Sequence, residues 1–173
     1  MFTEPSYESI DFTGIKADFD ELYKVKFIKC SFRSADFSDI TLNNCYFDTC
    51  DFTGSKLNGS ILKSSAFVNC VFRYANFFST TLDDCKMTGS SFPSAAFKAF
   101  TIAAGNWSYT VLTDVDFSNM KLYNINFEYA NLSNCNFSKS IVSGCNFSCA
   151  KLNGSNFRAA DIRSSCIENV EIL

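Results

Sequence analysis

The stretch from Cys30 to Phe52, CSFRSADFSDITLNNCYFDTCDF, decides the fold because a large apolar side chain recurs at every fifth position. Outward from this stretch, the same spacing runs from Leu22 to Ile172 without an insertion. All 31 of these positions are apolar, and 15 of them hold phenylalanine. A smaller residue, usually Ala, Cys or Ser, stands two positions before most of them, as Cys30 does before Phe32.

Neither an α-helix nor a straight strand explains a period of five. Five helical residues advance about 500°, which would scatter the apolar positions around the helix. In a strand, five is odd, so successive apolar positions would alternate between opposite faces. The pattern instead predicts a chain that turns a corner once in every five residues. Within each short segment, the small and the large residue lie two apart and therefore point inward together.

A second period, of 20 residues, predicts the number of corners in one coil. Sorting the large positions by 20 gives one column without phenylalanine and another that is almost entirely phenylalanine. The first column is Leu22, Leu42, Leu62, Leu82, Ile102, Leu122, Val142 and Ile162. The second contains Phe37, Phe77, Phe97, Phe117, Phe137 and Phe157. Four corners per coil follow, with like residues stacked at the strand spacing of about 4.8 Å.

Several segments resemble the motif of the pentapeptide-repeat proteins, in which a small residue precedes Asp or Asn, then Leu or Phe, then two polar residues. They are Ala35-Asp36-Phe37-Ser38-Asp39, Ala75-Asn76-Phe77, Ala130-Asn131-Leu132-Ser133-Asn134 and Cys145-Asn146-Phe147-Ser148. The resemblance implies an all-β fold, a right-handed quadrilateral β-helix of about seven to eight coils with a packed interior. We expect the repeat to cover residues 22–173 and residues 1–21, which depart from it, to form an N-terminal cap.

Composition narrows the class of protein. The chain has 173 residues, 47% of them apolar, with 20 phenylalanines and no histidine. No transmembrane stretch or signal peptide is recognisable, so we expect one cytoplasmic domain. Without histidine, a phosphate loop, a nucleophile elbow or a metal-ligand cluster, we expect no enzyme, no catalytic or metal site and no cofactor.

The nine cysteines are interpreted mainly as core residues. Seven occupy small inward positions, where cysteine packs as a small hydrophobe: Cys30, Cys45, Cys50, Cys70, Cys85, Cys135 and Cys145. Cys149 and Cys166 lie outside that class and are the more reactive candidates. An odd number of cysteines, none in a C-x-x-C pair, favours free thiols in a reducing compartment.

Residues outside the inward positions supply the candidate contact sites. A candidate apolar binding patch contains Val68, Val71, Tyr74, Phe78, Tyr109 and Tyr129, the last two being expected to stack at equivalent corners. Singly exposed apolar residues are the alternative interpretation. Candidate acidic contacts are the pairs Asp83/Asp84 and Asp114/Asp116. The alternative interpretation is that these aspartates lie at solvated corners and contact no partner.

The last coil predicts a homodimer joined end to end. Its apolar residues Ile162, Ile167, Ile172 and Leu173 would be exposed in a single copy, together with unpaired backbone groups. A frayed end is the alternative.

One coil breaks the size rule. Phe100 occupies a small inward position, Gly105 the next one, and Trp107 a large one. We expect local repacking there, with Gly105 making room for its bulky neighbours.

The Phe-rich, Cys-containing repeats resemble the fluoroquinolone-resistance branch of the family, whose members bind bacterial type II topoisomerase as proposed DNA mimics. The resemblance implies a non-catalytic protein-binding role, with DNA gyrase or topoisomerase IV as partner. The distribution of charge argues against DNA mimicry by the body of the repeat, residues 22–173. Residues 1–21 carry six acids and one base, whereas residues 22–173 carry twelve acids and fourteen bases. A general protein-interaction scaffold therefore remains the alternative, and we expect no direct nucleic-acid binding.

Overall fold

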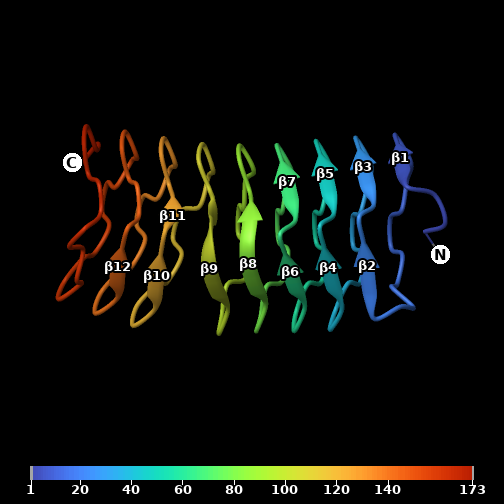
Figure 1. The fold of residues 1–173 in the computed structure, drawn as a ribbon, viewed down its shortest axis with the longest axis horizontal. Coiled ribbons are helices and arrows are strands. Elements are labelled where there is room, and N and C mark those ends of the chain that lie inside the picture. The colour runs from blue at the N-terminus through green and yellow to red at the C-terminus, as the bar shows by residue number, and fades with distance from the viewer. Residues whose placement is uncertain (1, 173) are drawn as a thin grey trace.

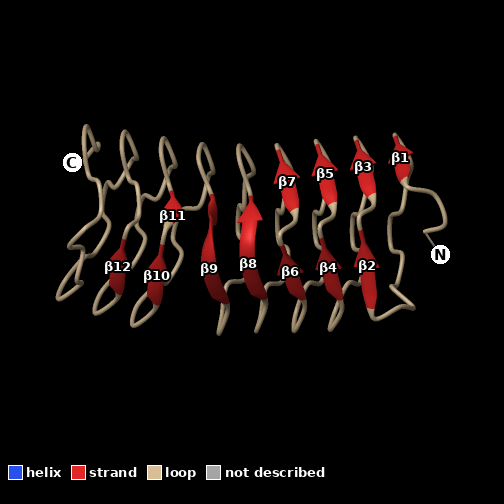
Figure 2. Cartoon of the chain, in the orientation of Figure 1, coloured by secondary structure: helices blue, strands red, loops and turns tan. Residues whose placement is uncertain are grey.

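The computed structural model describes residues 2–172, which form a rod of stacked coils with the two termini at opposite ends (Figure 1). Strands and turns make up the described chain, and it contains no helix (Figure 2). The strands are β1 (Ser6–Glu8), β2 (Glu21–Tyr23), β3 (Lys26–Ile28), β4 (Thr41–Asn43), β5 (Tyr46–Asp48), β6 (Ile61–Lys63), β7 (Ala66–Val68), β8 (Thr81–Lys86), β9 (Thr101–Asn106), β10 (Lys121–Tyr123), β11 (Ile125–Asn126) and β12 (Ile141–Ser143). The predicted all-β solenoid is confirmed, with about seven turns.

Each coil contains 20 residues and has four faces. On face 1, Leu22 pairs with Leu42 in a parallel ladder, and on face 2, Phe27 pairs with Phe47. Faces 3 and 4 are joined by isolated parallel bridges with the same offset, such as Asp11 to Ser31 and Lys16 to Asp36. The period of 20 in the sequence is therefore the offset between residues that pair in neighbouring coils.

The corners explain the polar part of the repeat. The residue two places after each large inward position has a left-handed φ in almost every repeat, for example Asp39 at 59° and Asn44 at 54°. This conformation costs an L-residue about 1–2 kcal/mol. Glycine adopts it without that cost, and Asn and Asp tolerate it better than other residues. Gly, Asn, Asp and Ser accordingly fill many of these corner positions.

The interior is a set of stacked side-chain columns. Phe47 stacks on Phe27 at 5.0 Å and on Phe67 at 4.7 Å, with the rings within 7° of parallel. Neighbouring columns meet edge to face, as Phe47 and Phe52 do at 5.3 Å. All these rings are fully buried. Removing one buried phenylalanine side chain from such a core costs about 3–5 kcal/mol.

The N-terminal segment enters the same register before residue 21, since β1 pairs with β3. The ring of Phe2 contacts those of Tyr7, Phe12 and Phe27 at centroid distances of 5.1–5.6 Å. This packing covers the first coil. The boundary between a cap at 1–21 and a repeat at 22–173 stays a prediction.

Counting coils from β1, the fifth coil is residues 86–105 and the sixth is residues 106–125. The ladder is interrupted on two faces between these two coils. Face 1 contains β9 and β10, which do not pair, so β10 and β12 form a separate sheet. Figure 1 shows β9 standing further from β10 than β10 from β12. The coils remain joined on face 2, where Gly105 pairs with Ile125, and on face 3, where Ser91 pairs with Val111.

Phe100 lies at the centre of this interruption. Its column holds buried small residues at Ser60, Thr80 and Ser140, and the larger but non-aromatic Ile40 and Met120. The Phe100 ring lies 4.9 Å from that of Phe97 and 5.8 Å from that of Phe117. It thus takes part in holding apart two coils whose phenylalanines would otherwise stack. The local repacking expected at Phe100 therefore extends to the backbone ladder.

Gly105 has a different role from the expected one of making room for bulky neighbours. Its φ is 113°, and a Cβ on it would overlap the backbone carbonyl oxygen of Cys85 in the coil below. Glycine is required here because two backbones approach closely.

We expect Gly105→Ala to lower the free energy of unfolding by about 3 kcal/mol or more, from backbone strain plus the clash with Cys85. Gly14→Ala is the matched control, because Gly14 has a φ of 70° and open space around its Cα. It should cost about 1 kcal/mol. Denaturant unfolding followed by circular dichroism measures both, and equal losses would contradict the assigned role of Gly105.

Candidate functional site

Tyr109 and Tyr129 stack at one edge of the rod. They occupy the corner between faces 2 and 3 in successive coils, with ring centroids 4.9 Å apart and planes within 10°. Both are about half exposed. A hydrogen-bonding contact with Cys149, in the next coil, raises the pKa of Tyr129. The expected stacking of these two tyrosines is confirmed.

The other predicted patch residues are distributed over three faces. Val68 is half-buried on face 2, and Val71 is exposed on face 3. Tyr74 occupies the corner between faces 3 and 4, and Phe78 is exposed on face 4. Tyr74 is thus separated from the Tyr109 corner by the width of face 3. Sequence reasoning missed Val111, which is exposed on face 3 two coils beyond Val71.

The two acidic pairs have different surroundings. Asp83 and Asp84 lie in β8, where pairing with both neighbouring strands is intact. Asp114 and Asp116 lie on the coil that follows the interruption. Asp114 accepts a hydrogen bond from Asn134 at 3.1 Å, and Asp116 accepts one from Asn136 at 3.0 Å.

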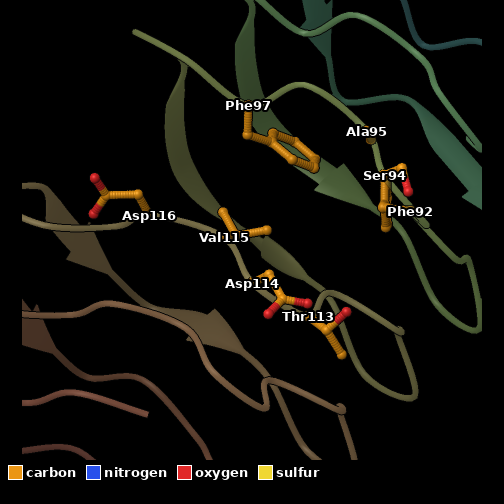
Figure 3. Close-up of a pocket in the computed structure, with 8 residues that line it drawn as sticks. All are labelled: Phe92, Ser94, Ala95, Phe97, Thr113, Asp114, Val115 and Asp116. Atoms are coloured by element: carbon orange, nitrogen blue, oxygen red, sulfur yellow. The ribbon is translucent and has the colours of Figure 1, made fainter. Parts of the chain in front are cut away.

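An opening of about 290 Å³ lies beside Asp114 and Asp116 (Figure 3). Ser94, Ala95 and Phe97 line it from the fifth coil, with Val115 and the two aspartates opposite. A second opening of about 220 Å³ shares the Phe97 and Asp116 walls and continues past Phe100. We call the two together the inter-coil opening. The sequence marks Phe100 as unusual in size and Asp114 and Asp116 as candidate contacts. It does not predict the cleft that these three residues line.

The last coil presents an apolar concavity of about 150 Å³. Seven apolar residues line it: Phe147, Leu152, Phe157, Ile162, Ile167, Val170 and Ile172. Ile167 and Ile172 are 51% and 66% exposed. Leu173, the fourth residue predicted for a dimer interface, lies outside the described residues.

The thiols divide as the sequence analysis predicted. Cys149 and Cys166 are half-buried, and the seven cysteines at inward positions are buried. Burial raises the pKa of Cys85 and of Cys135 to about 12, because the thiolate is disfavoured away from water. Cysteine sulfurs also donate to carbonyls of the preceding coil, as Cys135 does to Leu112 at 3.0 Å.

Within residues 2–172, no three acidic or cysteine side chains gather into a group that could hold a metal ion. That same part of the chain has no helix long and apolar enough to cross a membrane.

The geometry defines a class: a four-sided β-solenoid built from five-residue repeats. Family models described as "Pentapeptide repeat region" and "Pentapeptide repeats (8 copies)" match residues 20–97 and residues 110–148 and 143–171, respectively. The chain belongs to the pentapeptide-repeat family. The matches leave out residues 98–109, the stretch that contains Phe100 and Gly105. A search of curated proteins gave no significant match.

Among solved structures, the chain is similar to two trypsin-treated variants of QnrB1, a plasmid-mediated fluoroquinolone resistance protein. The identities are 23% and 24%, each with a TM-score of 0.70. The alignments cover 96% and 97% of this chain and 91% and 92% of QnrB1. HetL, involved in heterocyst differentiation regulation in the cyanobacterium Nostoc, is 16% identical with a TM-score of 0.43, covering 95% of this chain and 86% of HetL. The likeness to QnrB1 shows the fold.

We expect only two thiols to react quickly with a disulfide reagent near pH 8, because the other seven are shielded and the thiolate is the reactive form. Unfolding in guanidinium chloride should expose all nine. Replacing Cys149 and Cys166 with serine should remove the fast phase, whereas Cys85→Ser should leave it unchanged. Equal reactivity of all nine thiols in the folded protein would contradict the burial described here.

Proposed function

We propose that this chain is a non-catalytic binding protein whose leading partner is a bacterial type II topoisomerase, DNA gyrase or topoisomerase IV. The observation that carries the proposal is the match of its fold, over nearly its whole length, to a fluoroquinolone resistance protein. Nine free thiols support a reducing, cytoplasmic location for such a protein.

The charge distribution supports contact through one end of the rod. The six acids of residues 1–21 are all exposed on the first coil, and Lys16 is the one base among them. Later coils mix both signs, for example in the pairs of Arg33 with Asp51 and Lys56 with Asp36. A surface that binds DNA phosphates would be attracted to the acidic end more strongly than to the body.

A general protein-interaction scaffold is the second candidate. The near-balanced charge of residues 22–173 favours it, because that surface offers little resemblance to a DNA backbone. The exposed Val71, Tyr74, Phe78, Tyr109 and Tyr129 would then supply contacts to a partner of another kind.

We expect the protein to inhibit gyrase supercoiling, or to protect gyrase from fluoroquinolone-induced DNA cleavage, at low micromolar concentration. Neutralising three acids of the first coil should raise the protein concentration required about tenfold, since it weakens the attraction to a phosphate-binding surface. The three substitutions are Glu8→Gln, Asp18→Asn and Asp20→Asn.

The matched control removes the same number of exposed carboxylates from other coils and should have little effect. It consists of Asp39→Asn, Asp84→Asn and Glu168→Gln. No effect of the unmodified protein at tens of micromolar would exclude the topoisomerase proposal and leave the scaffold.

We further propose that two copies join end to end through the last coil. The lining of its concavity is wholly apolar, and burying Ile167 and Ile172 against a second copy would remove their side chains from water. A twofold axis at this end would bring the same apolar residues of both copies together.

In solution at micromolar concentration we expect twice the 19.3 kDa mass of one chain, measured by light scattering. Ile167→Asp should yield monomers, because an aspartate would be buried without a partner. Ile61→Asp is the matched control, since Ile61 is exposed on face 1 in the middle of the rod. A monomeric unmodified protein would contradict the dimer.

A further inference from the structure

The inter-coil opening exposes backbone groups whose counterparts along face 4 are paired in the other coils between residues 34 and 139. In the coil below, the N–H groups of Tyr74, Phe77 and Ser79 donate to carbonyls of the next coil at 2.8–3.0 Å. The corresponding groups of the fifth coil are the N–H groups of Ser94, Phe97 and Ala99. Among residues 2–172 these three find no backbone acceptor.

The opposite edge is unpaired as well. The N–H groups of Asp116 and Lys121 would donate to the carbonyls of Ala95 and Phe100 if the sixth coil followed the register of its neighbours. Neither bond is formed within the described chain. The opening therefore has two parallel edges that face each other, each with free donors and acceptors. A free strand edge is a template for another extended chain.

The side chains around the opening leave these edges accessible. The fifth coil carries Ala96, Ala99 and Ala103 at exposed positions that hold larger polar residues in many other repeats. Phe97 is only half-buried and forms a wall of both parts of the opening. Small exposed side chains and an apolar wall suit a peptide that binds mainly through its backbone.

The charge at the mouth is negative. Asp114 and Asp116 are exposed there, with Lys98 the one base that lines the opening. The hydrogen bonds from Asn134 and Asn136 engage one carboxylate oxygen of each aspartate. The second oxygen of each finds no partner within residues 2–172 and is free to accept from a cation.

We infer that the inter-coil opening is a docking site for an extended, basic peptide segment of a partner protein. The segment would lie parallel to both coils and pair with the free edges over residues 94–99 and 113–118, with a Lys or Arg side chain near Asp114 and Asp116. Phe100 keeps the site open. The inference rests on the proposed binding function but not on the identity of the partner.

The opening itself is tested by hydrogen exchange of the unliganded protein. The amides of Ser94, Phe97 and Ala99 should exchange at least tenfold faster than those of Tyr74, Phe77 and Ser79. A closed variant, Phe100→Ser with Val115→Ala, introduces the small residues that these columns hold in most other coils. It should slow the three fast amides at least tenfold, and unchanged exchange would overturn the role assigned to Phe100.

Binding is tested with a phage-displayed library of random heptapeptides, selected on the full chain. The selected peptides should be rich in Lys and Arg and should bind the closed variant at least tenfold more weakly by fluorescence anisotropy. Methylation of alternate peptide amides should abolish binding, because it removes backbone donors. Asp114→Asn with Asp116→Asn should weaken binding severalfold, and the matched Asp83→Asn with Asp84→Asn should not.

Recovery of no binding peptide, or equal binding to the closed variant, would overturn the docking site. These measurements contain no topoisomerase, so failure in the gyrase assay leaves them unaffected. Conversely, failure of the peptide measurements would leave the gyrase proposal standing, because that proposal rests on the acidic end of the rod.

Discussion

The stacking of like side chains at strand spacing is the constraint on which the rest of this structure depends. A ring such as Phe47 lies 4.7–5.0 Å above and below its neighbours, which is both the strand spacing and a favourable ring separation. Each large inward side chain therefore stacks on another large one in the coil below, as Phe37, Leu57 and Phe77 do. A five-residue repeat with a left-handed corner meets this requirement because it returns the chain to its starting column after 20 residues.

Phe100 shows what happens when this size rule is broken. Its column holds Ser60, Thr80 and Ser140 and no other aromatic residue, and the Phe100 ring contacts those of Phe97 and Phe117 where the two coils separate. The cost is a set of lost backbone hydrogen bonds on faces 4 and 1, while pairing at Gly105 and Ser91 holds the rod together. The side of the rod thereby gains an opening that is bordered by two exposed aspartates, Asp114 and Asp116.

The repetition of similar coils also limits which surfaces of the rod can recognise a partner. Its interior is filled by packed side chains, so recognition must use corners, flat faces, the two ends or an interruption of the ladder. The acidic first coil, the apolar last coil and the inter-coil opening are three such places, and they are chemically distinct. A partner that binds one of these places need not contact the other two. This separation makes the roles of the three testable one at a time.

The sequence by itself determined the coil length, the inward residues and the burial of seven cysteines, because each depends on strict local periodicity. It also predicted the stack of Tyr109 on Tyr129, which follows from their separation of 20 residues. It could not reveal that Phe100 would open the ladder rather than repack locally, since that outcome depends on how Phe97, Phe117 and Val115 share space across two coils. Nor could it place Asp114 and Asp116 beside that opening. Only the tertiary structure decided those points, because packing between coils is set by the sum of side-chain volumes and not by the spacing along the chain.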